Sequence, residues 1–271
     1  MTSTTASAPG NPTPAGPDAG PRPARAFAGP SLLRLTGVEL RKLADTRAGF
    51  WLLVTIALGT AVLAAVQLIW APDAEQTFGS FFTASLLPVG LLLPVLGILS
   101  ITAEWSQRTA LTTFALVPRR ERVIVAKLAA LVLAAAASTL TSLATAAAGT
   151  AIAGATGGAG TWRIEGALIL HATVLQVTNV LMGAGFGLLL LNTPLAIVSY
   201  LLLPTLWSVL GEMIRPLRGP AGWLDTGRTM EPLFTPDVTG EQWARLGVSL
   251  LVWMVLPLVA GLVRTMRREA A

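Results

Sequence analysis

The stretch GALILHATVLQVTNVLMGAGFGLLLLNTPLAIVSYLLLPTLWSVLG covers residues 166–211 and contains no Asp, Glu, Lys or Arg. A helix that crosses a bilayer needs about 20 mostly apolar residues, because each residue rises about 1.5 Å and the hydrocarbon core is roughly 30 Å thick. At 46 residues, the stretch is long enough for two such helices. Its natural break is Asn192-Thr193-Pro194, where a proline cannot continue the hydrogen bonding of the preceding helix. We therefore predict two spans, at about 166–191 and 194–211.

The rest of the chain has the same apolar character. Of its 271 residues, 53% are hydrophobic and 12% are charged, and the mean hydropathy is +0.67, which is too apolar for a soluble domain of this size. Further long apolar runs predict spans at about 49–70, 82–103, 128–153 and 246–263. The predicted fold is all-α: a polytopic membrane protein whose six transmembrane helices form one domain, 31–271.

The first thirty residues are of a different kind. They hold seven of the eighteen prolines of the chain and only Phe27 as an aromatic residue. Such a segment cannot bury enough apolar surface to offset the entropy lost on ordering, so we expect residues 1–30 to be a disordered tail. A signal peptide is not expected, because the segment lacks a basic n-region followed by an apolar h-region.

Residues 31–47 show helical amphipathicity. Glu39 lies within the apolar side of the helical wheel, which otherwise consists of Leu32, Leu33, Leu35, Leu40, Leu43 and Ala44, while Arg34, Arg41 and Asp45 lie opposite. This pattern predicts an N-terminal helix that rests in the membrane interface. The alternative is an ordinary juxtamembrane linker whose basic residues only set the orientation of the chain.

The distribution of Lys and Arg predicts the orientation. Fourteen of the nineteen lie before the first span, between the second and third spans, or after the sixth span. Cytoplasmic ends carry this excess, so we expect a multi-pass protein of the cell membrane with both termini and the tail in the cytoplasm. The sequence pI near 10.9 does not indicate nucleic acid as a partner, because the basic residues flank spans instead of forming one soluble patch. The lipid bilayer is the partner that this pattern predicts.

The second cytoplasmic stretch, EWSQRTALTTFALVPRRERVIVAK at 104–127, is longer than a turn between packed helices requires. Ala110, Leu111, Phe114 and Val117 share one helical face, and Pro118 ends the pattern. The stretch therefore predicts a short amphipathic helix followed by a basic segment. The alternative is a solvated loop whose arginines only enforce orientation.

The same stretch carries a family resemblance, in the order Glu104-Trp105-Ser106-Gln107-Arg108-Thr109, Thr112-Thr113, Val117-Pro118-Arg119-Arg120 and Lys127. With Glu39, Lys42 and Leu43 in the preceding amphipathic helix and six spans, it resembles the ABC type-2 permeases, over about 31–268. These are the membrane subunits of ABC exporters.

The resemblance implies that residues 109–118 form a coupling helix that docks an ATP-binding subunit. Phe114 would be its apolar anchor, and Arg119 and Arg120 would lie at the rim. The other residues of this coupling loop would be Glu104, Arg108, Thr109, Thr112 and Pro118. A second permease copy or a paralogue is the other partner implied, and substrate would pass between the two halves.

ATP hydrolysis is expected in a partner subunit, since a P-loop needs Gly-Lys-Ser/Thr and the two lysines here, Lys42 and Lys127, follow Arg41 and Ala126. The chain has no cysteine and one histidine, so we expect no cofactor and no metal site. An intramembrane enzyme is one alternative, although no carboxylate falls inside a predicted span. A membrane anchor without transport activity is another.

Three further features of the predicted spans leave alternatives open. Gly183 and Gly187, with Gly185 between them, predict close helix packing, either within one subunit or at a dimer or gating interface. His171 is expected to be a hydrogen-bonded packing residue, with a proton relay or substrate contact as the alternative. The proline- and glycine-rich segment 212–245 predicts short re-entrant or interfacial pieces on the outer side, with a solvated loop as the alternative.

Overall fold

The computed structural model describes residues 30–106 and 120–267, which form helices without any strand. Six helical segments are long and apolar enough to cross a membrane, so the predicted fold class is confirmed. They are α2 (Arg47–Trp70), α3 (Phe78–Ser106), α5 (Arg120–Thr156), α6 (Gly166–Leu190), α7 (Thr193–Met213) and a continuous last segment (Gly240–Arg267) made of α10 (Gly240–Leu250), the π-helix η4 (Leu251–Val255) and α11 (Leu256–Arg267).

The 46-residue apolar run divides at the predicted position. Leu191, directly after α6, adopts a left-handed conformation with φ of 52° and closes that helix. The side chain of Asn192 then accepts a hydrogen bond from the backbone N–H of Leu195 and caps α7, with Pro194 in the first turn where its missing N–H costs nothing. Helix capping therefore separates the two spans without any charged residue between them.

Several helices are longer than the predicted spans. The second span was predicted to end at residue 103 and the third to begin at 128, but α3 continues to Ser106 and α5 begins at Arg120. Glu104 consequently lies inside α3, at the end of that candidate span, and Lys127 lies two turns inside α5. The last span begins at Gly240 instead of 246, because Thr239 and Gln242 form a reciprocal capping box there.

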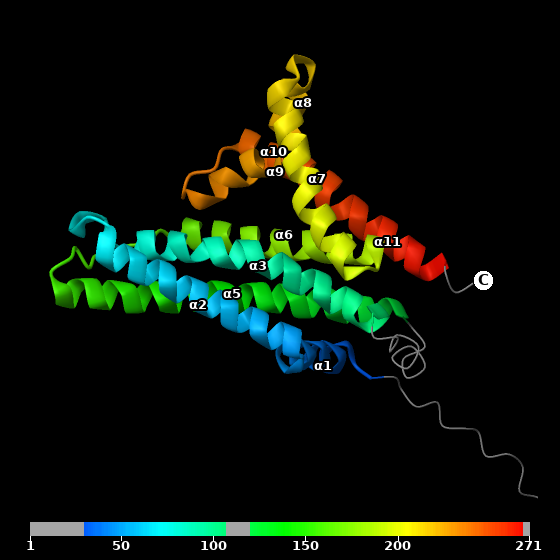
Figure 1. The fold of residues 1–271 in the computed structure, drawn as a ribbon, viewed down its shortest axis with the longest axis horizontal. Helices are drawn as coiled ribbons and strands as arrows, with labels where there is room; N and C mark the ends of the chain where they lie inside the picture. The colour runs from blue at the N-terminus through cyan, green and yellow to red at the C-terminus, as the bar shows by residue number, and fades with distance from the viewer. Residues whose placement is uncertain (1–29, 107–119, 268–271) are drawn as a thin grey trace, which may run out of the picture.

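The centre of the molecule is the contact between α3 and α6. In α6, 67% of the most apolar stretch is buried, against 11% in α2, and Figure 1 shows α2, α3, α5 and α6 lying side by side while α7 leans away from them. A side chain at Gly183 would meet the backbone of Pro94 in α3, and one at Gly187 would come within 3.3 Å of Ile98. These glycines therefore lie at a contact between helices of one chain.

The N-terminal helix α1 (Leu32–Asp45) forms, with Ser31 as its cap, and it packs through the middle of the predicted apolar side. Its buried residues are Thr36, Glu39 and Leu43, whereas Leu33 of the predicted leucine arc is 86% exposed. The helix contacts α5 and α2, so its packing face is chosen by contacts with the spans and not by apolarity alone. Its position in a membrane interface stays a prediction, and residues 1–29 of the predicted tail lie outside the described residues.

The segment between α7 and α10 consists of short helical pieces: η2 (Arg215–Leu217), α8 (Arg218–Leu224), α9 (Thr226–Met230) and η3 (Glu231–Phe234). Asp225 is buried and caps α9, and it also accepts a hydrogen bond from the hydroxyl of Ser208 in α7. The ring nitrogen Nδ1 of His171 lies 2.8 Å from the carbonyl oxygen of Thr235. His171 thus connects α6 to this segment, as expected for a packing residue.

Because the number of candidate spans is even, the two described ends of the chain lie at the same end of the bundle (Figure 1). Thr265, near the end of α11, lines one small cavity together with Glu104 of α3 and Lys127 of α5. The beginning of α1 is held at this end too, because Arg122 of α5 donates a hydrogen bond to the carbonyl oxygen of Pro30 at 3.1 Å. Both boundaries of the segment 107–119 therefore lie near the two ends of the described chain.

Candidate functional site: a buried charge cluster beside a cavity

Four charged side chains from three helices form a closed ring of ion pairs, which we call the charge cluster: Glu39 and Lys42 of α1, Glu104 of α3 and Lys127 of α5. The Nζ atom of Lys127 lies 2.6 Å from Glu39 Oε2 and 3.0 Å from Glu104 Oε1. The Nζ atom of Lys42 lies 2.8 Å from Glu39 Oε1 and 3.0 Å from Glu104 Oε1. Each carboxylate therefore faces both ammonium groups.

The cluster is largely removed from solvent. The side chains of Glu39 and Lys127 are each 7% exposed, and Lys127 also donates to the backbone carbonyl of Ser100 at 3.3 Å. A buried ion is tolerated only when partners and hydrogen bonds replace the lost water, and two cations opposite two anions meet that condition. The cluster thus explains why Glu39 lies on the buried face of α1.

Lys42 closes the ring on its more exposed side, with 42% of its side chain accessible. Burial lowers the pKa of Lys42, but its hydrogen bonds to Glu39 and Glu104 outweigh this effect and hold the pKa above the ordinary value for lysine. Lys42 therefore remains a cation at neutral pH and can pair with both carboxylates.

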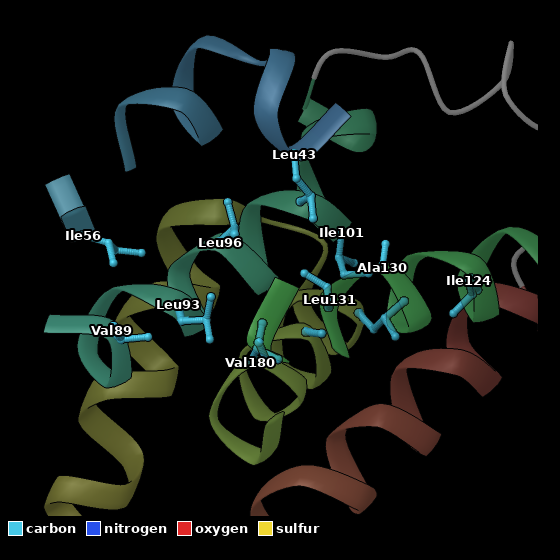
Figure 2. Close-up of a cluster of buried hydrophobic side chains, with 13 residues drawn as sticks. Leu43, Ile56, Val89, Leu93, Leu96, Ile101, Ile124, Ala130, Leu131 and Val180 are labelled. Atoms are coloured by element: carbon cyan, nitrogen blue, oxygen red, sulfur yellow. The ribbon is translucent and has the colours of Figure 1, made fainter. Parts of the chain in front are cut away.

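The local sequence of α1 places the cluster and its apolar support on one face. Glu39, Lys42 and Leu43 are three and four residues apart, which brings them together on a helix. Leu43 belongs to the main core cluster of buried side chains, and Figure 2 shows it reaching from α1 toward Leu96 and Ile101 of α3. Helix α1 is thus fixed to the spans by an apolar contact and by ion pairs one turn apart.

A cavity of about 740 Å³ adjoins the charge cluster. All four cluster residues line it, together with Arg47 at the start of α2. The rest of its lining is mostly apolar and includes Leu96, Leu99 and Ala103 of α3, with Thr46, Ser100 and Thr193 as further polar residues. The site therefore combines a charged wall, whose ions are mutually paired, with a larger apolar wall.

The structure brings some of the predicted site residues together and separates others. Glu39, Lys42 and Glu104 meet in the charge cluster with Leu43 beside them, although the sequence had assigned them to two separate segments. Gly183 and Gly187 lie in α6 and do not line the cavity. Arg120 is the first residue of α5. The remaining predicted coupling residues lie outside the described residues, in the segment between α3 and α5: Arg108, Thr109, Thr112, Phe114, Pro118 and Arg119.

Lys127 was not predicted as a site residue, although the sequence holds a signal for it. A glutamate within the apolar arc of a helix requires a buried cation, and Lys127 is one of only two lysines in the chain. What the sequence does not contain is the distance between residues 39 and 127, which only the packing of α1 against α5 supplies.

Comparison of the sequence with models of known protein families gives no match, and comparison with curated proteins gives none either. Within residues 30–106 and 120–267, no group of three or more His, Asp or Glu side chains is placed to hold a metal ion. The carboxylates of Glu39 and Glu104 are each engaged by two ammonium groups, an arrangement suited to joining helices.

Proposed function

We propose that this chain is the membrane-spanning subunit of an ABC exporter, moving substrate across the cell membrane with ATP that a separate subunit hydrolyses. One observation carries the proposal: the charge cluster joins α1 to both α3 and α5, the two helices that flank segment 107–119. That segment is the part of the chain that the family resemblance assigns to docking the ATP-binding subunit.

The cluster offers a route by which docking would move the spans. A displacement of segment 107–119 acts first on the ends of α3 and α5, which are joined to α1 through Glu104 and Lys127. Helix α3 is in turn packed closely against the central helix α6, where Gly97 of α3 lies against the backbone of Val180. Packed helices move as rigid elements, so closure of the ATP-binding subunits would be transmitted to the centre of the bundle. We assign to the charge cluster the role of holding these helices together during the coupling.

This proposal includes a topology in which both termini lie in the cytoplasm. Cysteines introduced singly at Arg119 and Trp223 of this cysteine-free chain should show opposite accessibility. We expect a membrane-impermeant maleimide applied to intact cells to label Trp223→Cys and not Arg119→Cys, because the basic end of the bundle faces the cytoplasm. Labelling of both positions after permeabilisation is the control for reactivity. Labelling of Arg119→Cys in intact cells would refute the topology.

The docking role of segment 107–119 can be tested with Phe114→Asp. A charge buried without a partner in an apolar contact is costly, so we expect the amount of ATP-binding subunit that co-purifies to fall at least about tenfold. Stimulation of its ATPase activity should fall in parallel. The matched control is Phe114→Leu, which keeps the position apolar and should retain most of the binding.

The yield and thermal stability of the Phe114→Asp chain alone must match the wild type for this result to count. Unchanged binding and stimulation in such a well-inserted variant would contradict the docking role. If the wild-type chain, purified from its native membrane, neither retains nor stimulates any ATPase, the exporter proposal fails. A membrane anchor without transport activity is then the better interpretation of its function.

A further inference from the structure

The cavity beside the charge cluster has the chemistry of an amphiphile site. Its volume of about 740 Å³ is within the range of ligand-binding pockets, roughly 300–1,000 Å³. Its lining includes the charged residues of α1, α3 and α5 as well as the apolar side chains of Leu43, Leu96 and Leu99. An occupant with a polar head and an apolar tail matches both kinds of lining residue, whereas a small inorganic ion matches only the charged ones.

The charge balance of the lining determines the sign of that head. The two lysines and two glutamates of the charge cluster compensate one another. Arg47 is the remaining charged residue of the lining, and among the residues that the structure describes it makes no ion pair or side-chain hydrogen bond. Among the described residues of the lining, the cations outnumber the carboxylates by one, and Arg47 is the cation that no carboxylate of these residues pairs. A guanidinium group presents parallel N–H donors that fit a phosphate, so a phosphate is the headgroup that complements this wall.

The place of Arg47 in the fold puts this charge where lipid phosphates lie. Arg47 is the first residue of α2, the span least buried by the rest of the chain. Phe50 and Trp51 follow within one turn, and the side chain of Trp51 is 65% exposed. Exposed aromatic residues at the end of a span mark the boundary between hydrocarbon and headgroups. A lipid in the adjacent leaflet therefore has its phosphate at the depth of Arg47.

We propose that the cavity binds one anionic phospholipid, with its phosphate at Arg47 and an acyl chain against Leu96 and Leu99 of α3. Basic pockets between transmembrane helices are a recurring way to hold anionic headgroups. The bound lipid would supply the negative charge that balances Arg47 and fill the apolar part of the cavity. This inference does not depend on the exporter proposal, since it uses only the lining of the cavity.

The test uses the purified full-length chain in neutral detergent, with phosphatidylglycerol and phosphatidylcholine added in separate titrations and bound lipid counted by native mass spectrometry. We expect phosphatidylglycerol to bind about tenfold more tightly than phosphatidylcholine, and Arg47→Gln to remove this preference. Arg41→Gln removes an exposed charge from the outer face of α1 and is the matched control, for which the preference should remain.

A second variant tests the cavity itself. Ala103→Phe places a large ring on the wall of the cavity and should reduce the binding of both lipids. Inorganic phosphate and glycerol 3-phosphate, added as competitors, should displace little phosphatidylglycerol because neither can occupy the apolar wall. Retained preference in Arg47→Gln, an equal loss in Arg41→Gln, or full displacement by inorganic phosphate would each overturn the proposal.

Discussion

Replacing Lys127 with methionine should lower the free energy of unfolding by about 3–5 kcal/mol, the usual cost of removing one partner from a buried ion pair. Methionine keeps the length and apolar volume of the lysine stem, so the loss reports the charge and not a cavity. Among the described residues, Glu39 then keeps Lys42 as its one ionic partner and shares it with Glu104, while the Glu39 side chain is 7% exposed. Chemical denaturation in detergent micelles, followed by tryptophan fluorescence, measures the change.

A double variant makes this prediction specific. Glu39→Leu combined with Lys127→Met removes one charge of each sign, which leaves Lys42 paired with Glu104. We expect the double variant to be more stable than Lys127→Met alone, because an uncompensated buried charge costs more than an absent pair. Arg41→Met, on the exposed side of α1, should change the free energy by no more than about 0.5 kcal/mol. Destabilisation of the double variant by the sum of the two single variants would exclude the pairing.

The second large effect is expected at the closest approach of α3 and α6. A Cβ atom at Gly183 would lie 2.8 Å from the backbone carbon and 2.9 Å from the Cα of Pro94, and it would clash with the carbonyl oxygen as well. Backbone atoms cannot turn aside as a side chain can, so the two helices must separate. We expect Gly183→Ala to lower the free energy of unfolding by about 2–3 kcal/mol, measured in the same denaturation experiment.

The control is the same substitution where space is open. No atom lies within 4 Å of the Cβ position at Gly247, which sits in α10. Gly247→Ala should therefore raise the free energy of unfolding by about 0.5–1 kcal/mol, because alanine loses less conformational entropy in a helix. Opposite signs for the two substitutions would establish the close contact, and a neutral Gly183→Ala would argue against it.

The number of spans could be predicted from the sequence because hydropathy is a one-dimensional property. Residues 166–211 contain enough apolar residues for two spans, and the cap formed by Asn192 is a local interaction with Leu195. Neither feature depends on the position of distant segments. For the same reason the start of α1 directly after Ser31 could be anticipated, since the capping bond of Ser31 reaches only to Arg34.

The ends of the spans at the charge cluster could not be predicted in this way. Glu104 and Lys127 are charged, so the sequence favours a position outside the apolar spans for both. The second predicted span therefore ended before Glu104, and the third began after Lys127. In the structure both residues lie within helices because each is paired with a charge from another helix. Pairing across 23 to 88 positions of sequence is a property of the packed bundle, and no local pattern contains it. The burial of a charge on the apolar side of α1 has the same cause, because Lys127, one partner of Glu39, comes from another helix.

The strong burial of α6 has a consequence for how the protein is made. Of the six spans, α6 exposes the least of its apolar stretch, and it carries Gln176 and Asn179 at buried positions. A nascent α6 that entered the bilayer alone would present these amides to hydrocarbon, which is unfavourable. Helix α3 is synthesised earlier and offers the backbone carbonyl of Leu86 to Gln176. We therefore expect α6 to enter the bilayer more readily when α3 is already beside it, so that assembly with α3 assists the insertion of the central helix.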